Sequence, residues 1–358
     1  MAKILVLPGD GIGPEVTAQA EKVLRLVNDA RGLGLEFETG LLGGAAIEAH
    51  GSPLDDATLQ KARESRAILL GAVGLPRFDG LAMGKRPGGG LLKLRKELQL
   101  YANLRPAKVF DNALEASSLR PERVKGADII IVRELTGGIY FGEPRGIREE
   151  DGRRFGLNTM IYHDDEILRI QRVAIALARK RSGRLTSVDK GNATDVGRFW
   201  REVTRELYAQ EATDLQTDHM YVDNAALQII RDPLQFDVMV MGNMFGDILS
   251  DCAGNIPGSL GMLPSASLGD ANALYEPCHG SAPDIAGEDK ANPIAAILSA
   301  AMLLNHTLGH PELEATIHQA VQDVLNTHCT VDLRLSQCQV VTCSDMGARI
   351  ADRVGELL

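Results

Sequence analysis

Short runs of aliphatic and β-branched residues alternate with longer segments in which apolar residues recur every three or four positions. The run KILVLP (3–8) precedes a segment behind Pro14 whose helical face carries Val16, Ala20, Val23, Leu24 and Val27. Further apolar runs predict strands at 67–74, 127–135, 185–192 and 236–243. Helical spacing predicts helices at 164–180, 194–209, 224–231, 291–308 and 311–326. Such alternation is typical of an α/β protein with a largely parallel sheet.

The predicted strands end in polar residues. Functional groups in α/β sheets gather at the carboxyl ends of strands, and Arg133, Lys190 and Asp247 all fall at such ends. The segment 75–90, LPRFDGLAMGKRPGGG, is rich in glycine and proline and predicts a long, mobile loop.

Composition narrows the class of protein. A chain of 358 residues allows two domains or one large α/β domain. A net charge of −10 argues against nucleic acid or an anionic membrane as the main partner. The longest apolar run, 294–304, is too short to cross a bilayer, and the chain opens on a strand pattern rather than a leader. Five cysteines without a C-x-x-C motif, Cys252 and Cys278 among them, indicate reduced thiols in a cytoplasm.

Asp247 and Asp251 lie four residues apart, directly after an apolar run and a Gly-Asn break. If the chain is helical from Met244, both carboxylates share one face and repel each other by a few tenths of a kcal/mol. A divalent cation or a pair of basic side chains would offset this repulsion. A solvated helix face is the alternative interpretation.

The glycine loop GDGIGP (9–14) follows a predicted strand and precedes a predicted helix. Pro14 stands where the dinucleotide fingerprint G-x-G-x-x-G has its third glycine, and no second strand with an acidic end follows at the usual distance. A standard Rossmann site is therefore disfavoured. The glycines would allow a cofactor to approach closely, or they form a plain tight turn.

Basic side chains gather near the same strand ends. Arg95, Arg105 and Arg133 come from separate segments, and their planar guanidinium groups suit a dicarboxylate. Arg133 ends an apolar run, so we expect it to be buried beside an anionic partner. Lys190, near arginines and a metal, would have a lowered pKa and could act as a base. Tyr140 is a candidate proton donor, or a ring packed beside a glycine turn.

Over nearly its whole length the chain resembles the β-decarboxylating dehydrogenases, the isocitrate/isopropylmalate dehydrogenase family. The most specific segments are GNMFGDILSD (242–251) and HGSAPDIAG (279–287). Others are LPGDGIGPE (7–15), LRKELQLYANLRP (94–106), VRELTGGIYFGEPRG (132–146) and MYVDNAA (220–226).

The resemblance implies two α/β domains that share a twisted mixed sheet, with a cleft between them and no Rossmann fold. The expected cofactor-side domain is 1–102 plus 254–358, and the expected substrate, metal and dimerisation domain is 103–253. It further implies a homodimer whose active sites share residues, with no nucleic acid and no membrane as partner.

The implied activity is the NAD-dependent oxidation and decarboxylation of a 3-substituted malate, first of all 3-isopropylmalate to 4-methyl-2-oxopentanoate in leucine biosynthesis. The resemblance assigns the substrate carboxylates to Arg95, Arg105 and Arg133, and catalysis to Tyr140 and Lys190. It assigns Mg²⁺ or Mn²⁺ to Asp223, Asp247 and Asp251, where Asp223 also faces the substrate and comes with Lys190 from the other subunit.

For the cofactor, the resemblance implies NAD, because a carboxylate at Asp284 accepts hydrogen bonds from ribose hydroxyls and repels a 2′-phosphate. The cofactor-binding residues that it implies are Ile12, Gly74, His279, Gly280, Ser281, Ala282, Asp284, Ile285 and Asn292.

Three positions depart from the isopropylmalate enzymes, while the apolar wall of Leu91 and Leu92 is retained. Gly88 replaces a glutamate that approaches the nicotinamide ribose. Gly191 and Ala193 replace an alanine and a valine, and that valine lines the pocket for the isopropyl group. These changes suggest a roomier pocket.

Two alternatives therefore stay open. One is a paralogue that acts on another 3-alkyl- or 3-arylmalate, on D-malate or on tartrate. The other is a non-catalytic homologue, against which the retained arginines, Tyr140, Lys190 and aspartates speak. Isocitrate is disfavoured because Leu91 and Leu92 offer no partner for a third carboxylate.

Overall fold

The computed structural model describes residues 2–358, which divide into two compact units. The first unit comprises the described residues up to Leu100 together with Val109–Pro121 and Pro257–Leu358. The second comprises Tyr101–Lys108 and Glu122–Ile256. Each unit builds its own part of the architecture from strands that alternate with helices.

The strands of the first unit lie in the order β2-β1-β3-β12-β11. Their bounds are β1 Ala2–Gly9, β2 Leu35–Thr39, β3 Ala67–Ala72, β11 Pro264–Leu268 and β12 Ala273–Pro277. All neighbours are parallel except β11 and β12, which form an antiparallel pair. A small parallel pair, β13 His328–Cys329 and β14 Gln339–Val340, lies near the C-terminus.

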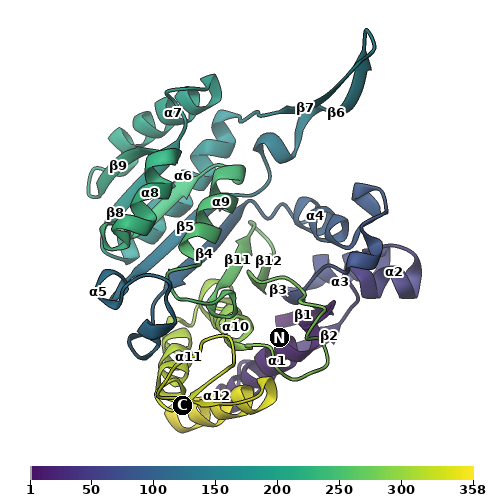
Figure 1. Ribbon diagram of the computed structural model, residues 1–358, viewed down its shortest axis with the longest axis vertical. Helices are drawn as coiled ribbons and strands as arrows, with labels where there is room; N and C mark the ends of the chain where they lie inside the picture. The colour runs from purple at the N-terminus through teal and green to yellow at the C-terminus, as the bar shows by residue number, and fades with distance from the viewer. Residues whose placement is uncertain (1) are drawn as a thin grey trace. The chain divides into compact units, whose positions relative to one another are not determined.

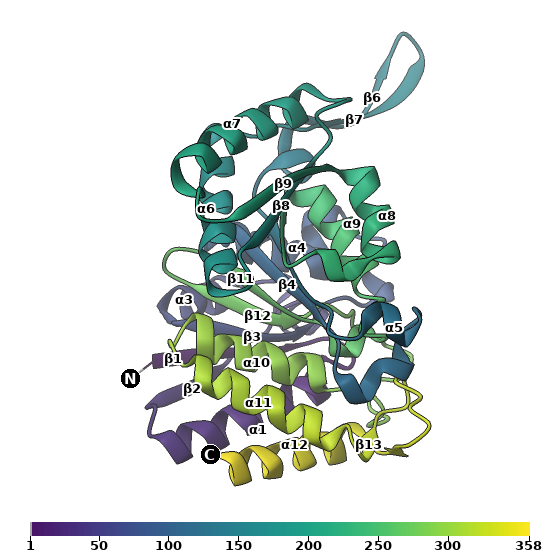
Figure 2. The ribbon, with the colours of Figure 1, turned by 90° about the vertical axis from the view of Figure 1, so that its left-hand side faces the viewer.

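Helices enclose this sheet on both faces. Their bounds are α1 Gly13–Arg31, α2 Gly44–His50, α3 Asp56–Glu64, α4 Pro87–Glu97, α10 Ile294–His306, α11 Pro311–Val324 and α12 Cys343–Leu357. Helix α10 contacts α1, α11, β11 and β12, and its first eleven residues are all buried. Figure 2 shows α1, α10, α11 and α12 gathered beside β1 to β3. On the other face, Leu5, Leu7, Ile68 and Leu70 pack against leucines that include Leu94 of α4.

The strands of the second unit lie in the order β4-β5-β10-β8-β9. Their bounds are β4 Ala102–Lys108, β5 Asp128–Glu134, β8 Arg184–Asp189, β9 Gln216–Tyr221 and β10 Val238–Met241. Strand β4 is antiparallel to β5, and the other neighbours are parallel. The carboxyl ends of β5, β8 and β10 therefore lie at one edge of the sheet.

Two pairs of helices cover the strands of the second unit. Helices α6 (Asp164–Lys180) and α7 (Asp195–Glu211) contact each other, as do α8 (Val222–Arg231) and α9 (Asn243–Ala253), and Figure 2 shows the pairs on opposite sides of the strands. A short helix, α5 (Pro121–Val124), precedes β5. A long hairpin, β6 (Gly142–Glu150) and β7 (Arg153–Thr159), extends away from these helices (Figure 1) and is mostly exposed.

Local sequence explains why these elements form. Helix α6 buries Ile167, Ile170, Ala174, Ile175 and Ala178 along one face. A capping box lies at its N-terminus, and it carries acidic residues in its first turn and basic residues in its last. Its bounds are those predicted from the sequence. The other four predicted helices are also confirmed, within three residues at each end. The four predicted strands appear too, with bounds that differ from the prediction by up to three residues at each end.

Two predictions need correction. The segment 75–90 is not one long loop: it holds 3₁₀ turns at Pro76–Phe78 and Met83–Lys85, and α4 begins at Pro87, because proline is tolerated in the first helical turn. The segment Val109–Pro121 belongs to the first unit rather than to a domain spanning 103–253. There Asn112 donates to the Asn326 side chain and the Phe110 ring stacks on His318.

No helix in the described chain is both long and apolar enough to cross a membrane. The apolar run at 294–304 instead forms most of α10, whose 13 residues pack between helices and strands of the first unit.

The central position of α10 makes its side chains critical for stability. We expect Ile297→Ala, at a site with no exposed surface, to lower the free energy of unfolding of the first unit by about 2–5 kcal/mol. Val340→Ala, at a side chain that is more than half exposed, should change it by less than about 0.5 kcal/mol. Urea unfolding of the two variants checks this, and equal midpoints would contradict the assignment of α10 as core.

Candidate active site

An ion pair between Arg133 and Asp247 lies at the centre of the second unit. Arg133 is the last but one residue of β5 and has only 5% of its side chain exposed, and its Nη1 donates to Oδ1 of Asp247 at 2.5 Å. Asp247 lies one turn into α9 and keeps 38% of its side chain exposed. The buried arginine therefore has the anionic partner that the sequence predicted, and the carboxylate still faces solvent.

A second arginine joins this pair from β4. Arg105 lies 3.7 Å from Asp247 and 3.5 Å from Asp251, measured from guanidinium nitrogen to carboxylate oxygen. Its Nη1 donates to Oγ of Ser250, and its Nε donates to Oδ1 of Asn103 two residues earlier on the same strand. One guanidinium thus lies beside both aspartates of α9, so basic side chains offset their repulsion, as one interpretation of the sequence held.

Asn243, the first residue of α9, was not singled out from the sequence. Its Oδ1 accepts from Nε and Nη2 of Arg133 at 3.0 and 2.7 Å, and its Nδ2 donates to the carbonyl of Gly137. The side chain therefore fixes the plane of the guanidinium. Gly246 allows the close approach, because a Cβ there would lie 2.6 Å from Cβ and Cγ of Arg133. The Gly-Asn break and the helical glycine were the available sequence signals.

Tyr140 approaches Asp247 from a 3₁₀ turn, Gly138–Tyr140, and its hydroxyl donates to Oδ2 at 3.0 Å. Burial and the neighbouring carboxylate of Asp247 raise the pKa of the Tyr140 phenol. It therefore stays protonated around neutral pH, as a proton donor must. Buried Glu134, also missed from the sequence, anchors this turn by accepting from the backbone N–H groups of Thr136 and Gly137.

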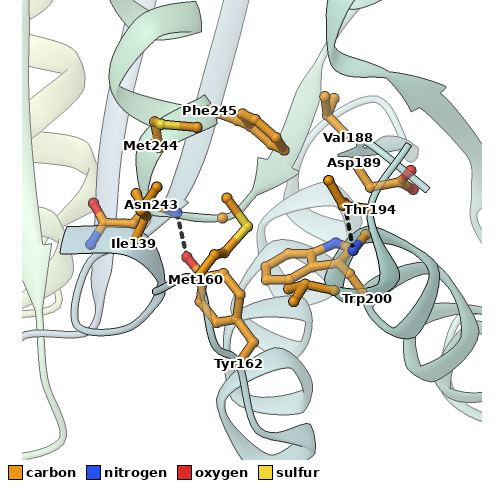
Figure 3. Close-up of a pocket in the computed structure, with 13 residues that line it drawn as sticks. Ile139, Met160, Tyr162, Val188, Asp189, Thr194, Trp200, Asn243, Met244 and Phe245 are labelled. Carbon is orange, nitrogen blue, oxygen red and sulfur yellow. Dashed lines mark hydrogen bonds between the residues drawn. The ribbon is translucent and has the colours of Figure 1, made fainter. Parts of the chain in front are cut away.

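An apolar pocket lies beneath this turn (Figure 3). Tyr162 and Trp200 meet edge to face with ring centroids 5.3 Å apart, and the Tyr162 hydroxyl accepts from the backbone N–H of Asn243 at 2.7 Å. Asp189, the one acidic residue in its lining, is bonded to Arg201. The pocket therefore supports the start of α9 rather than supplying reactive groups.

Lys190 and Asp223 form a separate pair. Lys190 follows β8, Asp223 lies in the first turn of α8, and Nζ donates to Oδ1 at 2.5 Å. The hydrogen bond from Lys190 lowers the pKa of the Asp223 carboxyl. The two residues therefore pair with each other within one chain. Their contribution to the active site of a second subunit stays a prediction.

In the first unit, three predicted cofactor residues lie around the glycine turn. The backbone N–H of Ile12 donates to the carbonyl of Ser281 at 2.8 Å, and the Ser281 hydroxyl donates to the carbonyl of Gly74. Asp10 ties the same region together by accepting from the backbone N–H groups of Gly74, Gly44 and Ala45. Hydrogen bonds thus link the glycine turn to the segments around Gly74 and Ser281.

The segment 279–292 carries the other predicted cofactor residues. Asp284 is exposed and available to hydroxyl groups, beside Gly280, Ala282 and Ile285 in the same segment. Burial lowers the pKa of the His279 imidazole, which keeps it neutral. Asn292 is buried, and its amide donates to Asp332 and accepts from the backbone N–H of Ile294, so it holds the segment in place.

Arg95, Leu91 and Leu92 all lie on α4. Arg95 donates to Glu276 at 2.6 Å, and both side chains are mostly buried, so Arg95 has a protein partner in the first unit. Leu91 and Leu92 line a hollow with Gly88 and Gly74. A Cβ at Gly88 would have no neighbour within 4 Å, so this hollow has room where a longer side chain would project.

The donor set of α9 fits a hard divalent cation. Asp247 and Asp251 offer carboxylate oxygens one helical turn apart, and 72% of the Asp251 side chain is exposed. Oxygen ligands of this type are what Mg²⁺ and Mn²⁺ prefer. The arginines beside them suit the carboxylates of a small acid. The arrangement thus fits an anionic ligand next to a divalent cation.

Comparison with known proteins then gives the family. The model of the isocitrate/isopropylmalate dehydrogenase family matches residues 3–350, and the chain belongs to this family. A 3-isopropylmalate dehydrogenase from Hahella chejuensis is 57% identical over 98% of both chains. One from Aquifex aeolicus is 52% identical over 99% of this chain and 98% of its own. The crystal structure of isocitrate dehydrogenase from Methylococcus capsulatus is similar, with a TM-score of 0.86, 34% identity and 99% of each chain covered.

Asp247 is one cause of the raised pKa of Tyr140, so we expect Asp247→Asn to lower that pKa. The difference in tyrosinate absorbance between Asp247→Asn and the same variant with Tyr140→Phe measures it across alkaline pH. Asp251→Asn is the matched control, since Tyr140 donates to Asp247 and not to Asp251. An unchanged Tyr140 titration in Asp247→Asn would contradict this electrostatic coupling.

Proposed function

We propose that the protein catalyses the NAD-dependent oxidation and decarboxylation of 3-isopropylmalate to 4-methyl-2-oxopentanoate, CO₂ and NADH, a step of leucine biosynthesis in the cytoplasm. One observation carries the proposal: Arg105 of β4 and Arg133 of β5 converge on Asp247 and Asp251 of α9. The names of relatives that are 52–57% identical over nearly the whole chain support it.

The arginines account for recognition of a malate. Arg133 is held in its plane by Asn243, and Arg105 by Asn103 and Ser250, so both guanidinium groups are preorganised. Preorganised guanidinium groups bind carboxylates by paired hydrogen bonds. Arg95 is assigned to the same task, and substrate carboxylate would then compete with Glu276 for its guanidinium.

Proton transfer falls to Tyr140 and Lys190. When bound, Mg²⁺ or Mn²⁺ at Asp247, Asp251 and the partner's Asp223 would supply Lewis acidity toward the substrate oxygens, and NAD would accept the hydride. We assign to Lys190 the proton of the substrate 2-hydroxyl, which its side chain accepts as the neutral amine. Tyr140, whose raised pKa keeps it protonated, returns a proton to the carbon that loses CO₂.

A homodimer would supply the second half of each site. Helices α8 and α9 contact each other and expose Leu227, Ile230 and Ile248, each more than half exposed. Clustered apolar side chains of this kind mark a protein interface. We assign this surface to a second copy of the chain, which brings Lys190 and Asp223 to the partner's arginines.

The substrate pocket has a second candidate occupant. Gly88 leaves open space beside Leu91 and Leu92. This space favours a 3-alkyl- or 3-arylmalate larger than isopropylmalate. The deciding experiment is a panel of isopropylmalate, benzylmalate, D-malate and tartrate with NAD and Mg²⁺, in which NADH and CO₂ are both followed. Equal release of NADH and CO₂ from isopropylmalate is the expected result, and no turnover of any 3-substituted malate would overturn the proposal.

Exposed Asp284 should make the protein prefer NAD to NADP. A like-charge contact with a 2′-phosphate costs on the order of 1.4 kcal/mol or more, which is about tenfold in kcat/KM. Asp284→Asn should narrow the ratio of the two kcat/KM values by that factor, while Asp352→Asn on α12 leaves it unchanged. Comparable kcat/KM values for both cofactors in the unaltered protein would refute the assignment.

Ala193→Val should shift selectivity toward isopropylmalate and away from benzylmalate. Valine adds two methyl-sized groups, each worth ~0.8 kcal/mol when buried, so we expect a change of roughly tenfold in the ratio of kcat/KM values. Steady-state kinetics with both substrates measure it. If the ratio does not move, Ala193 does not line the pocket.

Ile230→Glu should break the proposed dimer, because a carboxylate buried at an apolar interface lacks a partner. Sedimentation velocity should then show a monomer, with activity reduced along with dimer content. Val340→Glu, at an equally exposed side chain of the first unit, is the control and should remain dimeric. A dimeric Ile230→Glu variant would rule out this surface.

A further inference from the structure

A cluster of three potential metal ligands lies in the first unit, apart from the aspartates of α9. Glu15 lies in the first turn of α1, Asp289 follows the segment 279–287, and Cys343 is the first residue of α12. One oxygen or sulfur atom from each lies within 4.8 Å of the other two. No function discussed above uses these side chains together.

Two groups in this cluster lack the partners that buried polar groups normally have. Oε2 of Glu15 is buried and accepts no hydrogen bond, although Oε1 accepts from the backbone N–H of Gly287. The Cys343 side chain has no exposed surface, and within residues 2–358 its thiol makes no hydrogen bond. A buried anionic oxygen therefore lies beside a buried thiol, and neither is satisfied.

The carboxylate of Asp289, unlike Oε2 of Glu15 and the Cys343 thiol, has hydrogen-bond partners. Its carboxylate accepts from the backbone N–H and the hydroxyl of Ser344, and its carbonyl accepts from the N–H of Cys343. These bonds hold Asp289 at the start of α12, where a carboxylate is favourable. Each of its oxygens keeps a lone pair for a further ligand. The helix start explains Asp289 but leaves Oε2 of Glu15 and the Cys343 thiol without partners.

We propose that Glu15, Asp289 and Cys343 bind one divalent cation of the Zn²⁺ class. On binding, the Cys343 thiol releases its proton to solvent and a sulfur–metal bond forms, so no oxidation or reduction is involved. Thiolate sulfur selects Zn²⁺ or Co²⁺ over Mg²⁺, which distinguishes this site from one made of carboxylates alone.

The geometry requires little movement. Tetrahedral Zn²⁺ with one sulfur and two oxygen ligands places the ligand atoms roughly 3.5 Å apart, and the three atoms already lie within 4.8 Å of one another. Glu15 and Asp289 are only half-buried, so an ion can enter from their side. Bound metal would join the starts of α1 and α12 to the segment that follows residues 279–287, and a water can take the fourth position.

The test is a Co²⁺ titration of the full-length, metal-stripped protein in excess Mg²⁺, followed by thiolate-to-cobalt charge-transfer absorption. We expect one Co²⁺ per chain with this band, displaced by Zn²⁺ and retained in Cys338→Ser, a half-buried cysteine whose thiol donates to a backbone carbonyl. Cys343→Ser should lose the band. Glu15→Gln should weaken Co²⁺ binding by more than about tenfold, the smallest loss usually seen when a group that only hydrogen-bonds a metal ligand is changed.

Other outcomes overturn the proposal. A band that persists in Cys343→Ser, or no band in the unaltered protein at millimolar Co²⁺, excludes a thiolate site. Circular dichroism checks that each variant is folded. If Cys343→Ser does not fold, Glu15→Gln decides alone, because unchanged Co²⁺ affinity in that variant contradicts the site.

Discussion

A buried guanidinium near the end of β5 constrains how the second unit packs. Arg133 is nearly inaccessible and pairs with Asp247 on α9. Removing one partner of a fully buried pair costs about 3–5 kcal/mol, and less here because Asp247 is partly exposed. A cation in this position requires an anion nearby, so the strand end and the helix must meet. The exposed edge of that anion is what makes the pair useful for binding as well as for stability.

The neighbouring contacts serve the same pair. Asn243 fixes the plane of the Arg133 guanidinium, and Gly246 leaves room for the aliphatic part of the Arg133 side chain against α9. Glu134 holds the turn from which Tyr140 donates to Asp247. Arg105 adds a second positive charge beside both aspartates. The two guanidinium groups balance the charges of the two aspartates, so a divalent cation bound to the carboxylates would leave the site positive and attractive to a substrate carboxylate. This arrangement of charges suits the proposed binding of an acid and a metal at one place.

The sequence predicted what depends on local periodicity and on charge. The apolar face of α6 and its capping residues determined its bounds, and the apolar run before Arg133 predicted a buried arginine that needs an anion. Asn243 and Glu134 were not predicted from the sequence, because an amide at a helix start and a glutamate at a strand end acquire their roles only through contacts distant in sequence. Arg95 likewise gave no sign of its pairing with Glu276, 181 residues away. The segment Val109–Pro121 was misplaced for the same reason: its partners, near Asn326, lie far along the chain.

The central claim is that the exposed carboxylates of α9 bind a divalent cation together with the substrate. Mn²⁺ binding in the presence of 3-isopropylmalate, followed by the electron paramagnetic resonance of free Mn²⁺, tests it most directly. Asp251 is the more exposed ligand, and Arg105 keeps its hydrogen bonds to Asn103 and Ser250 without it, so Asp251→Asn should leave the fold intact. We expect Asp251→Asn to weaken Mn²⁺ binding at least about tenfold, whereas Asp352→Asn on α12 leaves it unchanged. An unaltered Mn²⁺ dissociation constant in Asp251→Asn would contradict the account.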